Sequence, residues 1–189
     1  SVDMFTDNDV GRLYKVLHYD VDDVPVYGVV RVRSVTSATS AEVDVIQPPD
    51  ATTPTLDWYA GTWGPNMPAP TAVGFFEGRL WLAGGDRVFG SASDVYDSFD
   101  TQQEGESGAI SRTVGFGPVA RASWLATGQT LTLGLATSEV AVRSTTLGEI
   151  LTPTNTNLRS VTTHGAAPVM PAEVDSVKYF VQRAGHRVV

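Results

Sequence analysis

Residues 70–100, PTAVGFFEGRLWLAGGDRVFGSASDVYDSFD, decide the fold class of this chain. Within them, residues 78–83 alternate from one side chain to the next in the manner of a β-strand. Two glycines and an aspartate follow at 84–86, where glycine tolerates the positive φ that tight hairpin turns require. Residues 87–91 then return as a second strand. The stretch therefore predicts a β-hairpin, and an acidic loop with interspersed aromatic residues follows it at 93–100.

The same hairpin pattern recurs twice downstream. Residues 131–143, LTLGLATSEVAVR, predict a hairpin that turns near 137–138, and residues 177–189, VKYFVQRAGHRVV, predict another that turns near 184–185. The turns lie about 50 residues apart, a spacing found between blades of β-propellers. We therefore expect residues 70–189 to form part of a β-propeller. The last hairpin stops with the sequence, and the first residue is not methionine, so we expect a fragment of a longer protein.

A different pattern precedes these hairpins. Three runs of alternating or β-branched residues, at 10–16, 26–33 and 41–46, predict a small β-meander module over residues 1–47. The prolines that follow cannot lie inside a sheet, so residues 48–69 are expected to be a Pro-rich linker. Frequent Gly, Pro and Thr leave no long amphipathic window for a helix. The predicted fold class is all-β: a small module, a linker and a partial propeller.

Composition argues against several classes of function. The chain has no cysteine, which excludes disulfides, thiol catalysis and cysteine-based zinc sites. Its formal net charge is −8 and its sequence pI is about 4.7, whereas a surface that holds nucleic-acid phosphates is basic. No run approaches the roughly 20 apolar residues that a membrane helix needs, so we expect no membrane segment.

Patterns for catalysis and metal binding are weak. His18, His164 and His186 are not accompanied by a Gly-x-Ser-x-Gly nucleophile turn, and we interpret them as structural or surface residues. The acidic runs lack the order of a calcium-binding loop, so we favour solvated loops over a calcium site. Many propellers cleave glycans with paired carboxylates, but the Ser-x-Asp-x-Gly-x-x-Trp turn of sialidases is absent here. We expect no enzyme activity, no cofactor and no metal.

Two acidic loops are the candidate contact surfaces, because loops on rigid β-scaffolds carry binding. We call residues 20–23 the tip loop and residues 94–106 the acidic loop. Removing either loop is expected to spare folding and to impair assembly with a partner. The candidate contact residues are Asp20, Asp22, Asp23, Asp94, Asp97, Asp100, Glu104 and Glu106.

Several motifs, in a fixed order, resemble those of the tail nozzle or hub proteins of short-tailed bacteriophages and related prophages, also called tail tubular or stabilisation proteins. The signature segment of that family has an Ala-Val-x-Phe-Phe-x-x-Arg-Leu strand, then Ala-Gly, Gly-Ser and an Asp followed by Phe. The matching residues here are AVGFFEGRL at 72–80, AG at 83–84, GS at 90–91, DSF at 97–99, LTPTN at 151–155, THGAAPV at 163–169 and YFVQRAG at 179–185, with RVRSVTSATSA at 31–41 resembling the small module that precedes the blades.

The resemblance implies a structural virion protein of the tail that forms part of the DNA-ejection conduit. It implies a homo-oligomeric ring, contacts with other tail and portal-adaptor proteins, and double-stranded DNA that passes through the lumen without specific binding. No catalytic residue carries over from the family motifs. The alternatives are a carbohydrate-binding or glycan-degrading propeller of a tailspike or receptor-binding protein, and an extracellular β-domain that binds calcium.

Overall fold

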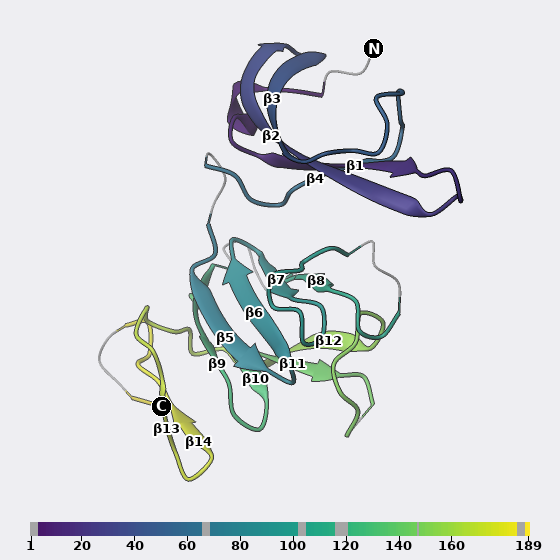
Figure 1. Ribbon diagram of the computed structural model, residues 1–189. Coiled ribbons are helices and arrows are strands. Elements are labelled where there is room, and N and C mark those ends of the chain that lie inside the picture. Colours follow the sequence, from purple (N-terminus) through teal and green to yellow (C-terminus); the bar gives the residue numbers. More distant parts are fainter. Residues whose placement is uncertain (1–3, 66–68, 102–104, 116–120, 147, 185–187) are drawn as a thin grey trace. The chain divides into compact units, whose positions relative to one another are not determined.

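The computed structural model describes residues 4–65, 69–101, 105–115, 121–146, 148–184 and 188–189 (Figure 1). The described chain is all-β, apart from one short 3-10 helix, which confirms the predicted fold class. It divides into two compact units, which are unit 1 (Ser1–Ala69) and unit 2 (Pro70–Val189). No helix in these described ranges is long and apolar enough to cross a membrane.

Unit 1 is one antiparallel four-stranded sheet with the strand order β3-β2-β1-β4. The long β1–β2 hairpin pairs without interruption from Leu13 and Arg31 to Tyr19 and Pro25. In β1 the side chains of Tyr14 and Val16 lie on one face, where they line an apolar cavity with Val30 and Val32 of β2, and the buried Leu17 lies on the other face. The elements are η1 (Asp7–Asp9), β1 (Leu13–Tyr19), β2 (Pro25–Ser37), β3 (Ser40–Gln47) and β4 (Trp58–Ala60).

The linker expected over residues 48–69 needs correction at β4. Trp58–Ala60 pairs antiparallel with β1 and completes the sheet of unit 1. No proline falls within these three residues, so their backbone N–H groups are free to join the ladder. The prolines of this region flank the strand instead of excluding it.

Unit 2 contains two four-stranded antiparallel sheets in which each strand pairs with the next along the chain. The hairpin predicted at 131–143 is confirmed as β10 and β11, and the one predicted at 78–91 as β6 and β7. The first sheet holds β5 (Ala72–Phe76), β6 (Arg79–Gly84), β7 (Arg87–Gly90) and β8 (Ile110–Thr113). The second holds β9 (Ala122–Ala126), β10 (Leu131–Leu135), β11 (Glu139–Ser144) and β12 (Thr156–Thr162).

The family motif at 72–80 is two strands here, not one. The chain reverses at Glu77 and Gly78, whose φ angles are 48° and 67°, so that Phe76 pairs with Arg79. Two successive positive φ angles give the tight turn that matches the twist of a hairpin. β5 therefore adds a fourth strand to the first sheet. A four-stranded meander is the topology of one propeller blade, and closure into a propeller stays a prediction.

The C-terminal hairpin is confirmed in part, because Val181 pairs antiparallel with Val188, and its first strand also pairs with a preceding strand. β14 (Val177–Tyr179) pairs with β13 (Ala172–Val174), a strand that the sequence did not indicate. Further along, the backbones of Phe180 and Val189 exchange hydrogen bonds of 2.9 and 3.0 Å. Part of the turn expected at 184–185 lies outside the described residues.

The two sheets of unit 2 share one apolar core. β9 of the second sheet lies against β5 and β6 of the first. Each sheet also pairs a tryptophan with a glycine on the next strand: Trp81 lies opposite Gly90, and Trp124 lies opposite Gly134. A Cβ added to Gly134 would lie 2.1 Å from the Trp124 ring, so only glycine leaves room for this indole. The core residues include Trp81, Ile110, Leu125, Leu131, Leu133, Leu135, Val140 and Val142.

Candidate contact loops and their supports

The tip loop connects β1 and β2 and is a rigid turn. One carboxylate oxygen of Asp20 accepts hydrogen bonds from the backbone N–H groups of Asp22 and Val24, both at 2.9 Å. Asp23 adopts a φ of 62°, a conformation that Asp tolerates better than most residues. The side chains of Asp22 and Asp23 are exposed. Asp20 is therefore used by the turn itself, and Asp22 and Asp23 are the exposed candidate contact residues of this loop.

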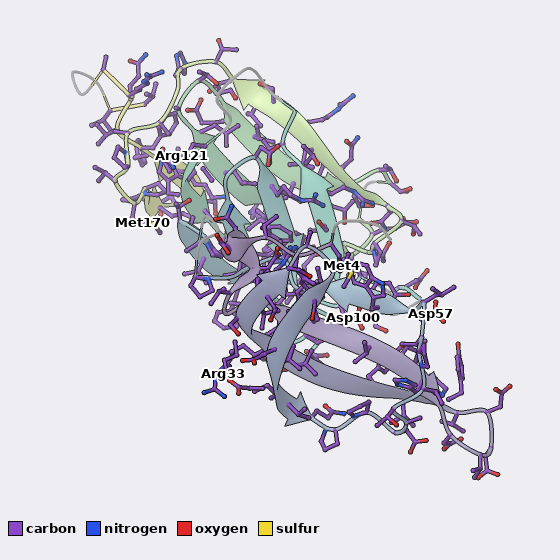
Figure 2. The ribbon with its side chains drawn as sticks, turned by 90° about the horizontal axis from the view of Figure 1, so that it is seen from above. Met4, Arg33, Asp57, Asp100, Arg121 and Met170 are labelled. Carbon is purple, nitrogen blue, oxygen red and sulfur yellow. The ribbon has the colours of Figure 1, made fainter. Side chains whose placement is uncertain are left out.

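The acidic loop follows β7 and folds back on itself. Backbone hydrogen bonds join Ala92 to Ser98 at 2.8 Å and Asp94 to Gly78 at 2.8 Å. The side chains of Asp94 and Asp97 are exposed, whereas Asp100, labelled in Figure 2, is half-buried. The Glu106 side chain is also exposed, and Glu104 lies outside the described residues. Asp94, Asp97 and Glu106 are thus the exposed carboxylates in the described part of this loop.

Arg79 anchors the acidic loop and is only 2% exposed. Its guanidinium donates to the carbonyls of Ser91 and Gly108, both at 2.6 Å, and to that of Glu106 at 2.8 Å. A longer bond of 3.3 Å reaches the Ser107 carbonyl. Buried polar groups must be paired, and here a single cation satisfies carbonyls at both ends of the loop. The Glu106 end of the acidic loop is therefore held against the first sheet by the buried Arg79 side chain.

The expectation that the acidic loop could be removed without loss of folding stays a prediction. Of the four carbonyls that Arg79 holds, only that of Glu106 belongs to residues 94–106; those of Ser91, Ser107 and Gly108 flank the loop and would remain after its deletion. Burial lowers the pKa of Arg79, while the carboxylates of Glu77 and Asp94 act in the opposite direction. The same expectation for the tip loop also stays a prediction; the described hydrogen bonds of this loop all stay within the loop or with its own hairpin.

A second buried network supports unit 1 and centres on Asp9. One carboxylate oxygen accepts from the Thr6 N–H and hydroxyl, both at 2.9 Å, and the other from Arg12 at 2.8 Å and the Tyr14 hydroxyl at 3.1 Å. The hydrogen bond from Arg12 is the main cause that lowers the pKa of Asp9 to about 2. Burial, followed by the Asp9 carboxylate, raises the pKa of Tyr14. The network therefore fixes the entry to β1.

Unit 1 also has an apolar cavity of about 380 Å³ on the face of its sheet. Phe5, Tyr14 and Trp58 contribute aromatic rings, valines of β1, β2 and β3 contribute aliphatic groups, and the segment Ala51–Thr55 adds three threonines to the wall. His18 lies at the rim, where its Nε2 makes a 2.9 Å hydrogen bond with the Thr53 carbonyl. That contact gives His18 a structural partner.

The described residues bring together no recognisable catalytic or metal centre. They contain no group of three or more His, Asp or Glu side chains placed to hold a metal ion. In the described ranges, neither His18 nor His164 hydrogen-bonds to a serine hydroxyl. His186 lies outside these ranges. The two contact loops belong to different units, so each is a separate candidate surface.

The residues that carry the family resemblance are structural supports. The hydroxyl of Ser91, in the Gly-Ser motif, is fully buried; it accepts from the Leu80 N–H at 3.0 Å and donates to the Ala92 carbonyl at 2.9 Å. In the LTPTN motif, Asn155 and Thr152 each bind the backbone N–H of the other through their side chains. These residues therefore pin turns through their side chains.

The two C-terminal motifs support one another. Gly165 of THGAAPV has a φ of 75°, and a Cβ there would lie 2.5 Å from the Ala136 carbonyl oxygen. Its own carbonyl accepts a 2.9 Å hydrogen bond from the backbone of Arg183 in YFVQRAG. The backbone of Ala167 in turn donates to Val181 at 2.9 Å. Glycine is thus required at 165 by both conformation and space.

No protein-family model matches the chain, and comparison with curated proteins finds no match.

Proposed function

We propose that this chain is a structural virion protein of a bacteriophage tail, where it forms part of the DNA-ejection conduit and docks neighbouring tail subunits. One observation carries the proposal: several motifs that resemble the tail nozzle family supply strand, core or turn-pinning residues of unit 2, which contains two successive four-stranded meanders. Such residues specify a rigid body. In this proposal the function is mechanical: the motifs maintain a rigid β-body and take part in no chemical reaction.

The charge distribution supports passage of DNA without specific binding. Unit 1 has ten acidic and four basic residues, a formal charge of −6, whereas unit 2 has eleven acidic and nine basic residues, a charge of −2. Phosphates are held by lysine and arginine contacts, and each contact strengthens salt-dependent binding. An acidic module offers few such contacts, so DNA can slide past it.

The contact chemistry of the proposal lies in the exposed carboxylates. Asp22 and Asp23 of the tip loop, and Asp94 and Asp97 of the acidic loop, are presented by rigid turns. Preorganised charged loops favour a specific partner orientation and fast association. The expected partners are other copies of the protein in a ring and the adjoining tail and portal-adaptor proteins.

Negative-stain electron microscopy and mass photometry of the protein that carries this chain test the proposal. We expect closed rings with a central hole wide enough for duplex DNA, alone or after addition of the portal-adaptor complex. A protein that stays monomeric with that complex present, and that binds bacterial surface polysaccharide on a glycan array, would instead be a receptor-binding propeller.

A further inference from the structure

A polar pocket of about 390 Å³ lies on the second sheet of unit 2, over β11 and β12. Arg143, Ser144, Thr145, Asn157 and Arg159 line it. All five offer hydrogen-bond donors, and no carboxylate is among them. In a chain with 21 acidic and 13 basic residues, a pocket lined by two arginines and no acid is a distinct feature.

Strand register explains how the two arginines come to share this pocket. Arg143 of β11 lies opposite Asn157 of β12, and Arg159 lies opposite Ala141. The arginines are therefore diagonal neighbours on one face of the sheet, a separation of about 7–8 Å that long side chains span easily. Val142 and Leu158, on the alternate positions, face the core instead. Both guanidiniums can thus contact one ligand from the outer face.

Within the described residues, neither guanidinium has a hydrogen-bond or ion-pair partner, and both side chains are exposed. Other arginines are satisfied: Arg12 pairs with Asp9, and Arg79 and Arg112 donate to backbone carbonyls. Two neighbouring like charges repel, so this arrangement does not stabilise the fold. The opposite position at 141 holds a buried alanine, where a carboxylate could have neutralised Arg159.

We propose that this pocket binds a phosphate group, as the free ion or on a small phosphorylated molecule. A single arginine already satisfies the two oxygens of a carboxylate with two parallel hydrogen bonds. Two arginines, an amide and two hydroxyls match the larger number of oxygens and the double negative charge of a phosphate. The net negative charge of the chain and the presence of only two cations here disfavour an extended nucleic-acid backbone.

The test uses residues 1–189 and inorganic phosphate, titrated against chloride at matched ionic strength and followed by amide NMR. We expect shift changes centred on residues 143–145 and 157–159. The double variant Arg143→Gln and Arg159→Gln should weaken phosphate binding at least about tenfold. Substituting lysine at both positions should restore only part of it, because lysine lacks the guanidinium fork.

The matched control replaces Arg31 and Arg33 with glutamine. These residues are also exposed and two apart on one strand, β2, and Arg33 points away from the ribbon in Figure 2. The control removes the same charge and should leave phosphate binding unchanged. Arg31 lies opposite Asp44 and therefore has an acidic neighbour that the pocket arginines lack.

Any of the following results would overturn the proposal that this pocket binds phosphate. Equal responses to phosphate and chloride, or equal losses in the control, would show non-specific charge attraction. Duplex DNA that binds much more tightly than phosphate, with a salt dependence of many contacts, would show a nucleic-acid surface. A change of oligomeric state in the double variant, with no phosphate binding by the unsubstituted chain, would show that the arginines contact a protein.

Discussion

Replacing Arg79 with methionine is expected to destabilise unit 2 by about 3–5 kcal/mol, the usual cost of breaking a buried charged network. Methionine keeps most of the side-chain length but offers no donor. The carbonyls of Ser91 and Gly108 are in buried residues and would each lose a 2.6 Å hydrogen bond. An unsatisfied buried acceptor costs about 1–3 kcal/mol, so these two alone account for about 2–6 kcal/mol. That is a large part of the 5–15 kcal/mol by which domains are typically stable.

Urea unfolding followed by tryptophan fluorescence measures this cost, because the buried Trp81 and Trp124 report on unit 2. Arg79→Lys is a second variant; its ammonium keeps the charge but cannot hold carbonyls on both sides, so we expect an intermediate loss. Arg87→Met is the matched control, since Arg87 is exposed and donates to the Ser111 hydroxyl. It should change stability by less than about 1 kcal/mol. A comparably small effect for Arg79→Met would refute the view that this arginine anchors the acidic loop.

Three further predictions concern separate parts of the chain. The pKa of Asp9 is about 2 in the folded state, against 3.8 for an ordinary Asp, so Asp9 contributes about 2 kcal/mol of folding stability above pH 4. That contribution is lost as the pH falls from 4 to 2. Asp9→Asn should lower the stability at pH 7 and abolish this loss between pH 4 and 2, as measured by urea unfolding at a series of pH values. Gly134→Ala should cost about 2–3 kcal/mol by overpacking the neighbouring indole, whereas Gly115→Ala, which meets only open space, should be neutral in thermal unfolding. Substituting asparagine for Asp22 and Asp23 together should leave stability within about 0.5 kcal/mol but reduce ring assembly in mass photometry; unchanged assembly would remove the tip loop from the contact surface.

The sequence contains enough information for the all-β class and the central hairpins, because alternation and glycine turns are local signals. The turn that separates β5 from β6 was missed because it is Glu-Gly, and a positive φ at Glu77 has no strong local signature. β4 was missed for a different reason. Trp58–Ala60 is too short to show alternation, and it becomes a strand only because β1 leaves an edge for it to pair with.

The exposed carboxylates of both loops could be predicted, since acidic turn residues are usually solvated. The role of Arg79 as a buried anchor could not be predicted from the sequence. Alternation places it on the same face as Trp81 but does not say which face is buried, and its acceptors are backbone carbonyls, which any residue supplies. The phosphate pocket was equally hidden, because Arg143 and Arg159 become neighbours only through the register of β11 and β12.

Immunogold electron microscopy tests the central proposal most directly. Antibodies raised against residues 1–189 would be applied to particles purified from the cells that encode this chain, with pre-immune serum as the control. We expect gold at the tail of the particles, or exposed there after the distal tail parts are removed. Particles whose tails, intact and stripped, carry no label, while the protein is found by immunoblot elsewhere in the same cells, would contradict a place in the tail conduit.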